Sequence, residues 1–371
     1  MPITLPSPVS CNRAVITPRT APLAGILVLI AGLSTPTIGA AQATPQKARG
    51  AATASATTST ARPSARARTT KKATYSATSA KARRLKLARA RAAARARMIR
   101  EAAIPRFKVD ENGAVVPDVH AAAAIIYNPE TGEVLWEEHS QDQRSIASIT
   151  KVMTAIVFLE SDPDLSEQVF VERSDVRRAS VTHLRANERV SVNDLLHMLL
   201  ISSDNAAARV LARVSPWGTE GFVARMNEKA MELGLTSTVY SDPSGLLADN
   251  VASAYDMARL IAYAAGDQRI AEIMRKADYQ VTTSRRRFTI HTTNALVRRP
   301  DVDVRGGKTG FIASSGYCLA TLLRLPEVDQ QVAVVVLGAR SNSGRFIEAR
   351  NLLSWLTSKA QDLFGRKEGQ Q

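Results

Sequence analysis

Acidic residues are absent from the first hundred positions of this 371-residue chain, which carry 18 lysines and arginines. Because the whole chain has 49 basic and 34 acidic residues, residues 101–371 hold 31 basic and 34 acidic ones, a net charge of −3. The formal charge of +15 therefore belongs to the N-terminal hundred residues alone. The rest of the chain has no bulk positive charge with which to bind an anionic polymer, and nucleic acid is not an expected partner.

Cysteine and long apolar runs are also scarce. The two cysteines, Cys11 and Cys318, cannot form a dense disulfide framework or a cysteine-based zinc site. No stretch reaches the roughly 18 consecutive apolar residues that a membrane-spanning helix needs. Beyond the first hundred residues, the chain is long enough to bury the core of a mid-sized enzyme domain.

The N-terminal segment 1–43 has the pattern of a signal peptide. Arg13 and Arg19 precede an apolar run from Leu23 to Leu33, which is too short to cross a bilayer. Ala41-Gln42-Ala43 then has the small-residue form of a signal-peptidase site. We expect export to the periplasm or cell-envelope space. If the segment is not cleaved, it would act as a short membrane anchor.

Residues 44–107 are rich in Ala, Thr, Ser, Arg and Lys and have almost no large apolar side chains. Such a composition cannot form a packed core, so we expect a disordered basic linker. Lys81 to Ala103 could be transiently helical because alanine and arginine favour helices. The segment would serve either as a solvated tether or as an electrostatic arm for lipid headgroups or other anionic surfaces.

Residues 108–371 show a mixture of helical and strand patterns. An apolar run at 121–127, turn residues at 128–132 and a second run at 134–136 predict a β-hairpin. Apolar residues recur at helical spacing over Ser148–Leu159, with Ser145 as the expected N-cap. Further helices are expected at 191–200, 206–214, 256–265, 268–276 and 346–363, and further strands at 289–293, 305–311, 317–323 and 332–337. We predict an α+β domain.

Several common catalytic signatures are missing. None of the five histidines lies in H-E-x-x-H, and no pair has the spacing of metal ligands. The chain also lacks G-x-S-x-G, a Walker loop and G-x-G-x-x-G. Ser-His-Asp hydrolases, P-loop enzymes and Rossmann dehydrogenases therefore have no support, and we expect neither a metal nor a cofactor.

One set of motifs remains. Ser148 and Lys151 form S-x-x-K on a predicted helix, where side chains three residues apart are neighbours. A lysine can remove the proton of a serine hydroxyl if burial or a nearby cation lowers its pKa. Lys308-Thr309-Gly310 supplies a later cation on an expected edge strand, and Ser203-Asp204-Asn205 lies between the two motifs. Its hydroxyl and amide could relay a proton and hold a substrate amide.

The order and spacing of these motifs are more specific than any one of them. S-x-x-K is expected about once by chance in a chain of this length. A second S-x-N, at Ser191, is better explained as a helix N-cap because Asp194 follows three residues later. The trio S-x-x-K, S-D-N and K-T-G, separated by 55 and 105 residues, has the order that characterises class A β-lactamases and penicillin-binding proteins.

From about Ala121 to Trp355, the sequence resembles the low-molecular-mass penicillin-binding proteins, the D-alanyl-D-alanine carboxypeptidases and endopeptidases of the cell wall. The resemblance extends beyond the trio to Arg144–Ala155, Ser202–Ala207, Asp242–Leu246, Gly307–Phe311 and Gly344-Arg345. It implies a β-lactamase-like fold: a five-stranded antiparallel sheet flanked by helices, an all-helical lobe, and a site between them. It also implies a serine-type hydrolase of peptidoglycan that takes part in cell-wall biogenesis and cell shape and is inhibited by β-lactams.

The resemblance also assigns catalytic roles. Ser148 would attack the carbonyl of the penultimate D-alanine and become acylated, with Lys151 as its general base. Ser203 would pass a proton toward the leaving amine, and Lys308 would keep the local field positive. Asn205 would hydrogen-bond both the substrate amide and Lys151.

Substrate binding is implied for a second group of residues. Thr309 and the adjoining Gly310 would contact the substrate, with Thr309 binding its carboxylate and Arg345 assisting. The backbone N–H groups of Ser148 and Phe311 would form the oxyanion hole. Without the resemblance, Arg345 would be interpreted as a surface residue in a strand-to-helix loop.

Two other functions remain open, as does the choice between carboxypeptidase and endopeptidase. Only 63 residues follow Lys308, and this short C-terminal part resembles the endopeptidase branch of the family. The stretches Thr182–Arg185 and Thr293–Leu296 resemble that branch as well. A β-lactamase would need fast deacylation, and no segment resembles the glutamate loop of class A enzymes. A non-catalytic wall-binding protein on the same fold would not need the serine and both lysines.

Overall fold

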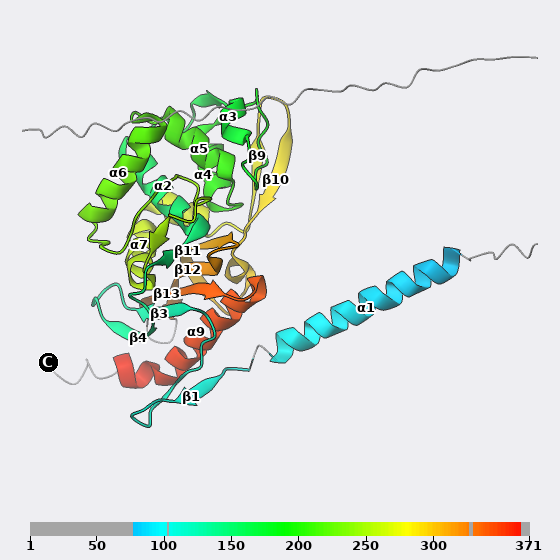
Figure 1. The fold of residues 1–371 in the computed structure, drawn as a ribbon, viewed down its shortest axis with the longest axis vertical. Helices are drawn as coiled ribbons and strands as arrows, with labels where there is room; N and C mark the ends of the chain where they lie inside the picture. The colour runs from blue at the N-terminus through cyan, green and yellow to red at the C-terminus, as the bar shows by residue number, and fades with distance from the viewer. Residues whose placement is uncertain (1–76, 102–103, 326–328, 365–371) are drawn as a thin grey trace, which may run out of the picture. The chain divides into compact units, whose positions relative to one another are not determined.

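The structure is a computed structural model that describes residues 77–101, 104–325 and 329–364 (Figure 1). The signal peptide expected at 1–43 and the first part of the expected linker lie outside these residues. Within the described ranges, no helix is both long enough and apolar enough to span a membrane.

Helix α1, Ala77–Glu101, lies in the segment expected to be a linker. Its sequence is dominated by Ala, Arg, Lys and Leu, which are strong helix formers. Lys81–Ala93 are all exposed, and the first turn contains no acidic residue. The helix therefore presents its basic side chains to solvent along this stretch.

The domain is built on a five-stranded antiparallel sheet with the order β11-β12-β13-β3-β4 (Figure 1). The strands are β3 (Ala123–Tyr127), β4 (Val134–Glu138), β11 (Asp303–Ile312), β12 (Gly316–Leu325) and β13 (Gln330–Ala339). The predicted hairpin is confirmed as β3 and β4, and Asn128 Oδ1 accepts the backbone N–H of Glu130 in its turn. The sheet that the resemblance implied is also confirmed.

Helices cover both faces of the sheet. Ala123, Ile125 and Tyr127 belong to the core on the side of α7 (Ala254–Gly266). The alternating Ala124 and Ile126 belong to a second core, together with Leu352 and Leu356 of α9 (Asn342–Phe364). All five side chains of β3 are buried because the strand has a core on each face.

A helical lobe packs around α2 (Thr150–Glu160). Its other helices are α4 (Val192–Leu200), α5 (Asn205–Val214), α6 (Gly218–Glu232) and α8 (Gln268–Met274), with the short α3 (Arg173–Val176). Residues 150–159 of α2 are all buried, which identifies it as the central helix of the lobe. The sequence analysis missed α6, although Phe222, Met226 and Ala230 form a buried stripe at helical spacing.

Short strand pairs and two 3-10 helices complete the fold. The pairs are β1 (Phe107–Val109) with β2 (Val115–Pro117), β5 (Arg144–Ser145) with β8 (Val251–Ala252), β6 (Gln168–Phe170) with β7 (Arg189–Ser191), and β9 (Asp278–Thr282) with β10 (Arg287–His291). The 3-10 helices are η1 (Ala147–Ile149) and η2 (Ala295–Arg298). The prediction that Ser145 caps a helix is wrong, because Ser145 is paired in β5 and its buried Oγ has no hydrogen-bond partner. The predicted cap at Ser191 is confirmed, since its Oγ accepts the Asp194 N–H at 3.0 Å.

Candidate active site

Ser148 and Lys151 lie one helical turn apart where η1 leads into α2. The Lys151 Nζ is 2.9 Å from the Ser148 Oγ. Ala147, just before the serine, has a φ of 47°, a conformation that costs energy for a residue with a Cβ. The sharp turn brings Ser148 to the start of the buried helix while Lys151 is already inside the lobe.

The Lys151 amine is completely buried among polar partners. It donates to Asn205 Oδ1 at 2.6 Å and to the Ser244 carbonyl oxygen at 2.5 Å. Burial lowers the pKa of Lys151 to about 7, against the opposing effects of the Asp242 and Asp204 carboxylates. A substantial fraction of the amine is therefore neutral near pH 7 and able to take a proton from Ser148.

The loop Asp242–Gly245 supports this helix start from behind. The Asp242 carboxylate accepts the backbone N–H groups of Ser244 and Gly245 at 3.0 and 3.1 Å. Gly245 has a φ of 74°, and a Cβ there would lie 2.0 Å from the Ala147 carbonyl oxygen. Only glycine allows the loop to lie this close. The sequence analysis noted this segment but assigned no role to Ser244, because a backbone carbonyl has no residue signature.

Ser203 and Lys308 form the second serine–lysine contact. Lys308 lies on β11 and its Nζ donates to Ser203 Oγ at 2.8 Å and to the Thr309 carbonyl at 2.9 Å. Burial holds the pKa of Lys308 well below its ordinary value, and the nearby charges of Lys151 and Arg345 lower it further. Ser203 has a φ of 62°, so its backbone is held in the left-handed region just before α5.

Asp204 and Asn205 start helix α5 and tie it to the site. Asp204 is the N-cap, and its Oδ1 accepts the Ala207 N–H at 3.0 Å. Asn205 places its Oδ1 on Lys151 and donates from Nδ2 to the Ala179 carbonyl at 2.7 Å. The Asn205 carbonyl oxygen and one of its two side-chain N–H groups are thus engaged, which fixes the orientation of the amide.

The K-T-G strand lies directly against the turn that carries Ser148. A Cβ on Gly310 would be 2.5 Å from the Ile146 carbonyl oxygen and 3.1 Å from the Ser148 nitrogen. The Thr309 Oγ1 is 2.6 Å from the Thr293 Oγ1, a partner that the sequence analysis did not identify. The Phe311 ring is half exposed and stacks on Tyr317 at 4.2 Å between ring centroids. The oxyanion-hole roles of the Ser148 and Phe311 N–H groups stay predictions.

Arg345 occupies the first turn of α9 and is buried, rather than exposed in a loop. Its NH1 donates to the carbonyl oxygens of Gly310 and Cys318 at 2.9 and 3.1 Å. These contacts clamp the end of β11 to its neighbour β12. Burial lowers the pKa of Arg345 to about 10. Its part in binding a substrate carboxylate stays a prediction.

The structure thus brings all three sequence motifs together. The Ser148–Lys151–Asn205 group comes from the helical lobe, whereas Lys308, Thr309 and Gly310 come from the sheet edge. In the described part of the chain, no three His, Cys, Asp or Glu side chains cluster as metal ligands would.

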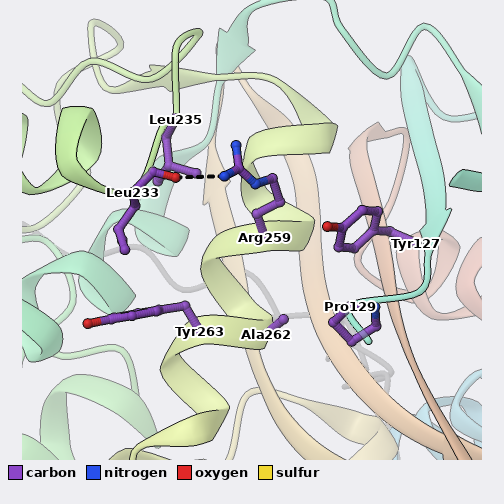
Figure 2. A pocket seen from close by; sticks show the side chains of 7 residues that line it. All are labelled: Tyr127, Pro129, Leu233, Leu235, Arg259, Ala262 and Tyr263. Atoms are coloured by element: carbon purple, nitrogen blue, oxygen red, sulfur yellow. Dashed lines mark hydrogen bonds between the residues drawn. The ribbon is translucent and has the colours of Figure 1, made fainter. Parts of the chain in front are cut away.

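Two surface pockets lie apart from these residues. Figure 2 shows one of about 360 Å³, where Arg259 of α7 donates to the Leu233 carbonyl at 2.8 Å. Its lining consists of Tyr127, Pro129, Leu233, Leu235, Arg259, Ala262 and Tyr263. The second, of about 550 Å³, lies farther along α7, between the ends of α2 and α8. None of the motif residues lines either pocket.

Comparison with known proteins agrees with this geometry. A D-alanyl-D-alanine endopeptidase of Escherichia coli (strain K12) is 32% identical over 244 residues, covering 65% of this chain and 78% of that protein. A D-alanyl-D-alanine carboxypeptidase of Bacillus subtilis (strain 168) is 29% identical over 247 residues, covering 64% and 62%. A variant of a Streptomyces DD-transpeptidase has a similar structure, with a TM-score of 0.61 and 25% identity, covering 66% of this chain and all of that one.

The family model matches as well. The model for D-alanyl-D-alanine carboxypeptidases, peptidase family S11, matches residues 110–341. This range contains all three motifs and the five strands of the sheet. The resemblance and the fold inferred from the sequence are confirmed, and the chain belongs to the D-alanyl-D-alanine carboxypeptidase family of serine-type peptidases.

Proposed function

We propose that this protein hydrolyses the D-alanyl amide bonds that crosslink peptidoglycan stem peptides, acting as a DD-endopeptidase. The observation that carries the chemistry is the buried Lys151 amine, 2.9 Å from the Ser148 hydroxyl and with its pKa lowered to about 7. The preference for crosslinks is supported by relatives in three organisms that are named D-alanyl-D-alanine endopeptidases, each with 78% of its length covered.

The acylation step uses both serine–lysine contacts. Neutral Lys151 takes the proton of Ser148 as the Ser148 Oγ forms a bond to the carbonyl carbon of the crosslinking D-alanine. The carbon–nitrogen bond breaks, and the leaving amine receives a proton through the Ser203 hydroxyl, which Lys308 holds in a positive field. Water then attacks the ester, which releases the acyl group as a carboxylic acid and restores the Ser148 hydroxyl.

The remaining motif residues position the substrate. Asn205 holds the substrate amide, while Thr309 binds the carboxylate with the assistance of Arg345. The N–H groups of Ser148 and Phe311 stabilise the oxyanion, and loss of one such donor typically costs about 2.7–4 kcal/mol of barrier. The same acylation by a β-lactam ring would inhibit the enzyme. No segment of the sequence resembles the glutamate loop of class A β-lactamases, so this alternative has less support.

Two substrates and one variant test this proposal. The purified protein is incubated with a monomeric pentapeptide and with a D-alanyl-crosslinked dimer, and the products are resolved by mass. We expect conversion of the dimer to monomers, and no conversion by Ser148→Ala. Release of free D-alanine from the monomer, with the dimer left intact, would make the protein a carboxypeptidase. Failure of a penicillin to acylate Ser148 would instead favour a non-catalytic wall-binding protein.

The proposal includes export and a role for the basic arm. Export rests on the signal pattern at 1–43 and on membership of a cell-wall enzyme family. The exposed basic side chains of α1 favour binding to an anionic surface, such as lipid headgroups. Deletion of residues 44–104 should abolish binding to vesicles with anionic lipid and leave turnover of a short soluble peptide unchanged. A large loss of turnover would show that the arm belongs to the catalytic machinery.

A further inference from the structure

The loop between α3 and β7, residues 177–188, is anchored to the S-D-N motif. The Asn205 N–H donates to the Val181 carbonyl at 2.9 Å. The backbone N–H of His183 donates to Asp204 Oδ2 at 2.6 Å, and the His183 Nδ1 lies 3.5 Å from the same oxygen. Asp204 immediately follows Ser203, so the position of His183 is set from within the catalytic motif.

The hairpin of β9 and β10 is anchored to the K-T-G motif. Thr293, two residues beyond β10, meets Thr309 through the two hydroxyl groups and donates its N–H to the Ile201 carbonyl at 3.1 Å. From there the hairpin extends past the helical lobe toward α3 (Figure 1). At its tip, the Ser284 N–H donates to the Arg189 carbonyl at 2.8 Å, which joins the hairpin to β7.

The loop and the hairpin meet in a stack of three side chains. The His183 ring is parallel to the Phe288 ring within 15°, with the centroids 5.8 Å apart. The Arg286 guanidinium carbon lies 4.5 Å from the Phe288 centroid. Arg286 is fixed by Glu188, whose Oε1 lies 2.9 Å from its Nε. We call His183, Phe288 and Arg286 the shelf.

Two exposed arginines flank the shelf, and among the described residues their side chains have no acidic partner. Arg185 lies in the loop, and Arg285 lies in the hairpin tip beside Arg286. Both are exposed, and within the described ranges neither guanidinium has a carboxylate partner. Glu188, the acid inside the shelf, is buried and already paired with Arg286. The surface is therefore suited to a ligand that combines an apolar body with free carboxylates.

We propose that the shelf and its two flanking arginines bind the second, carboxylate-bearing peptide strand of a crosslink, on the leaving-group side of the site. This inference rests on the proposed function, in which Ser203 protonates the leaving amine. Because Asp204 holds His183 next to Ser203, a peptide strand departing past Ser203 reaches the shelf. A free D-alanine is too short to do so. The shelf would thus select crosslinked over monomeric substrates.

A double variant, Arg185→Gln with Arg285→Gln, tests the charge of this surface. Neither guanidinium supports a buried acid, so the fold should be retained, unlike in a variant of Arg286. We expect kcat/KM for the crosslinked dimer to fall about tenfold through a higher KM, since two charge-assisted contacts are lost. His183→Ala should give a further rise in KM, because it removes the ring but keeps the backbone contact with Asp204.

A control is Arg275→Gln, which removes one positive charge, as each of the two shelf substitutions does, from an exposed arginine at the end of α8 that has no carboxylate partner within the described residues. It should leave dimer turnover unchanged. The rate of Ser148 acylation by a penicillin is measured for every variant and should stay within twofold of the wild type. Equal dimer turnover in the wild type and the double variant would overturn the shelf alone. Absence of acylation in the wild type would overturn the proposed function itself.

Discussion

The two buried lysines of the site come from different halves of the domain and have different neighbours. Lys151, from the helical lobe, lies near two carboxylates, Asp204 and Asp242, which oppose the effect of burial on its pKa. Lys308, from the sheet edge, has burial and two cations acting in the same direction. Equal burial is therefore combined with opposite surrounding charges. The comparison teaches that nearby carboxylates hold the pKa of Lys151 higher than burial alone would, at about 7.

The largest expected effect tests whether the helical lobe supplies the nucleophile. Ser148→Ala should abolish covalent labelling by a penicillin, because Ser148 carries the hydroxyl that hydrogen-bonds to the Lys151 amine. Labelling is measured by the mass of the intact protein, and the melting temperature should stay close to that of the wild type. Labelling of the variant at the wild-type rate would assign the nucleophile elsewhere.

The next largest effect compares the two lysines directly. Lys151→Met should slow acylation by about 10³-fold, within the range for loss of a general base. Lys308→Met should slow it less, by about 10²-fold, as expected for the loss of one electrostatic contact. Second-order rate constants for a penicillin give both values. Equal losses in the two variants would contradict the separate roles of base and field.

A smaller effect is the pH dependence that Lys151 confers. The rate of acylation by a penicillin should rise with pH around a midpoint of about 7. At pH 6 the rate should be about tenfold lower than at its plateau at high pH. Stability should rise in the same direction. Between the folded pKa of about 7 and the ordinary 10.5, the unfolded chain binds more protons, so the free energy of unfolding increases with pH. Melting temperatures from pH 7 to 9 should rise less in Lys151→Met than in the wild type.

The smallest expected effect tests whether the charge of one arginine acts on the pKa of Lys151 without acting on that of Lys308. Arg209 of α5 lowers the pKa of Lys151, and Lys308 is not among the groups that it affects. Arg209→Gln should therefore move the midpoint of the acylation profile upward by a few tenths of a pH unit. The plateau rate should be unchanged. A downward shift, measured over pH 5–9, would reverse the sign assigned to this arginine.

The sequence predicts which motif residues form the candidate site, although it does not predict the contacts that hold them in place. Helical spacing placed Ser148 beside Lys151, and the motif order predicted their approach to Lys308. The roles of Ser244 and Thr293 were missed because one acts through a backbone carbonyl and the other through a contact between distant segments. The sequence identified Arg345 as a candidate site residue. It did not predict the hydrogen bond from Arg345 to the Gly310 carbonyl, because that contact depends on the packing of α9 against the sheet.

Cys318 has a practical consequence for studying this enzyme. It is fully buried in β12, and burial raises the pKa of its thiol, so the side chain stays protonated and inaccessible. Thiol reagents should leave this native cysteine unmodified in the folded domain. In a chain without Cys11, a cysteine introduced at an exposed position could then be labelled selectively in the folded domain.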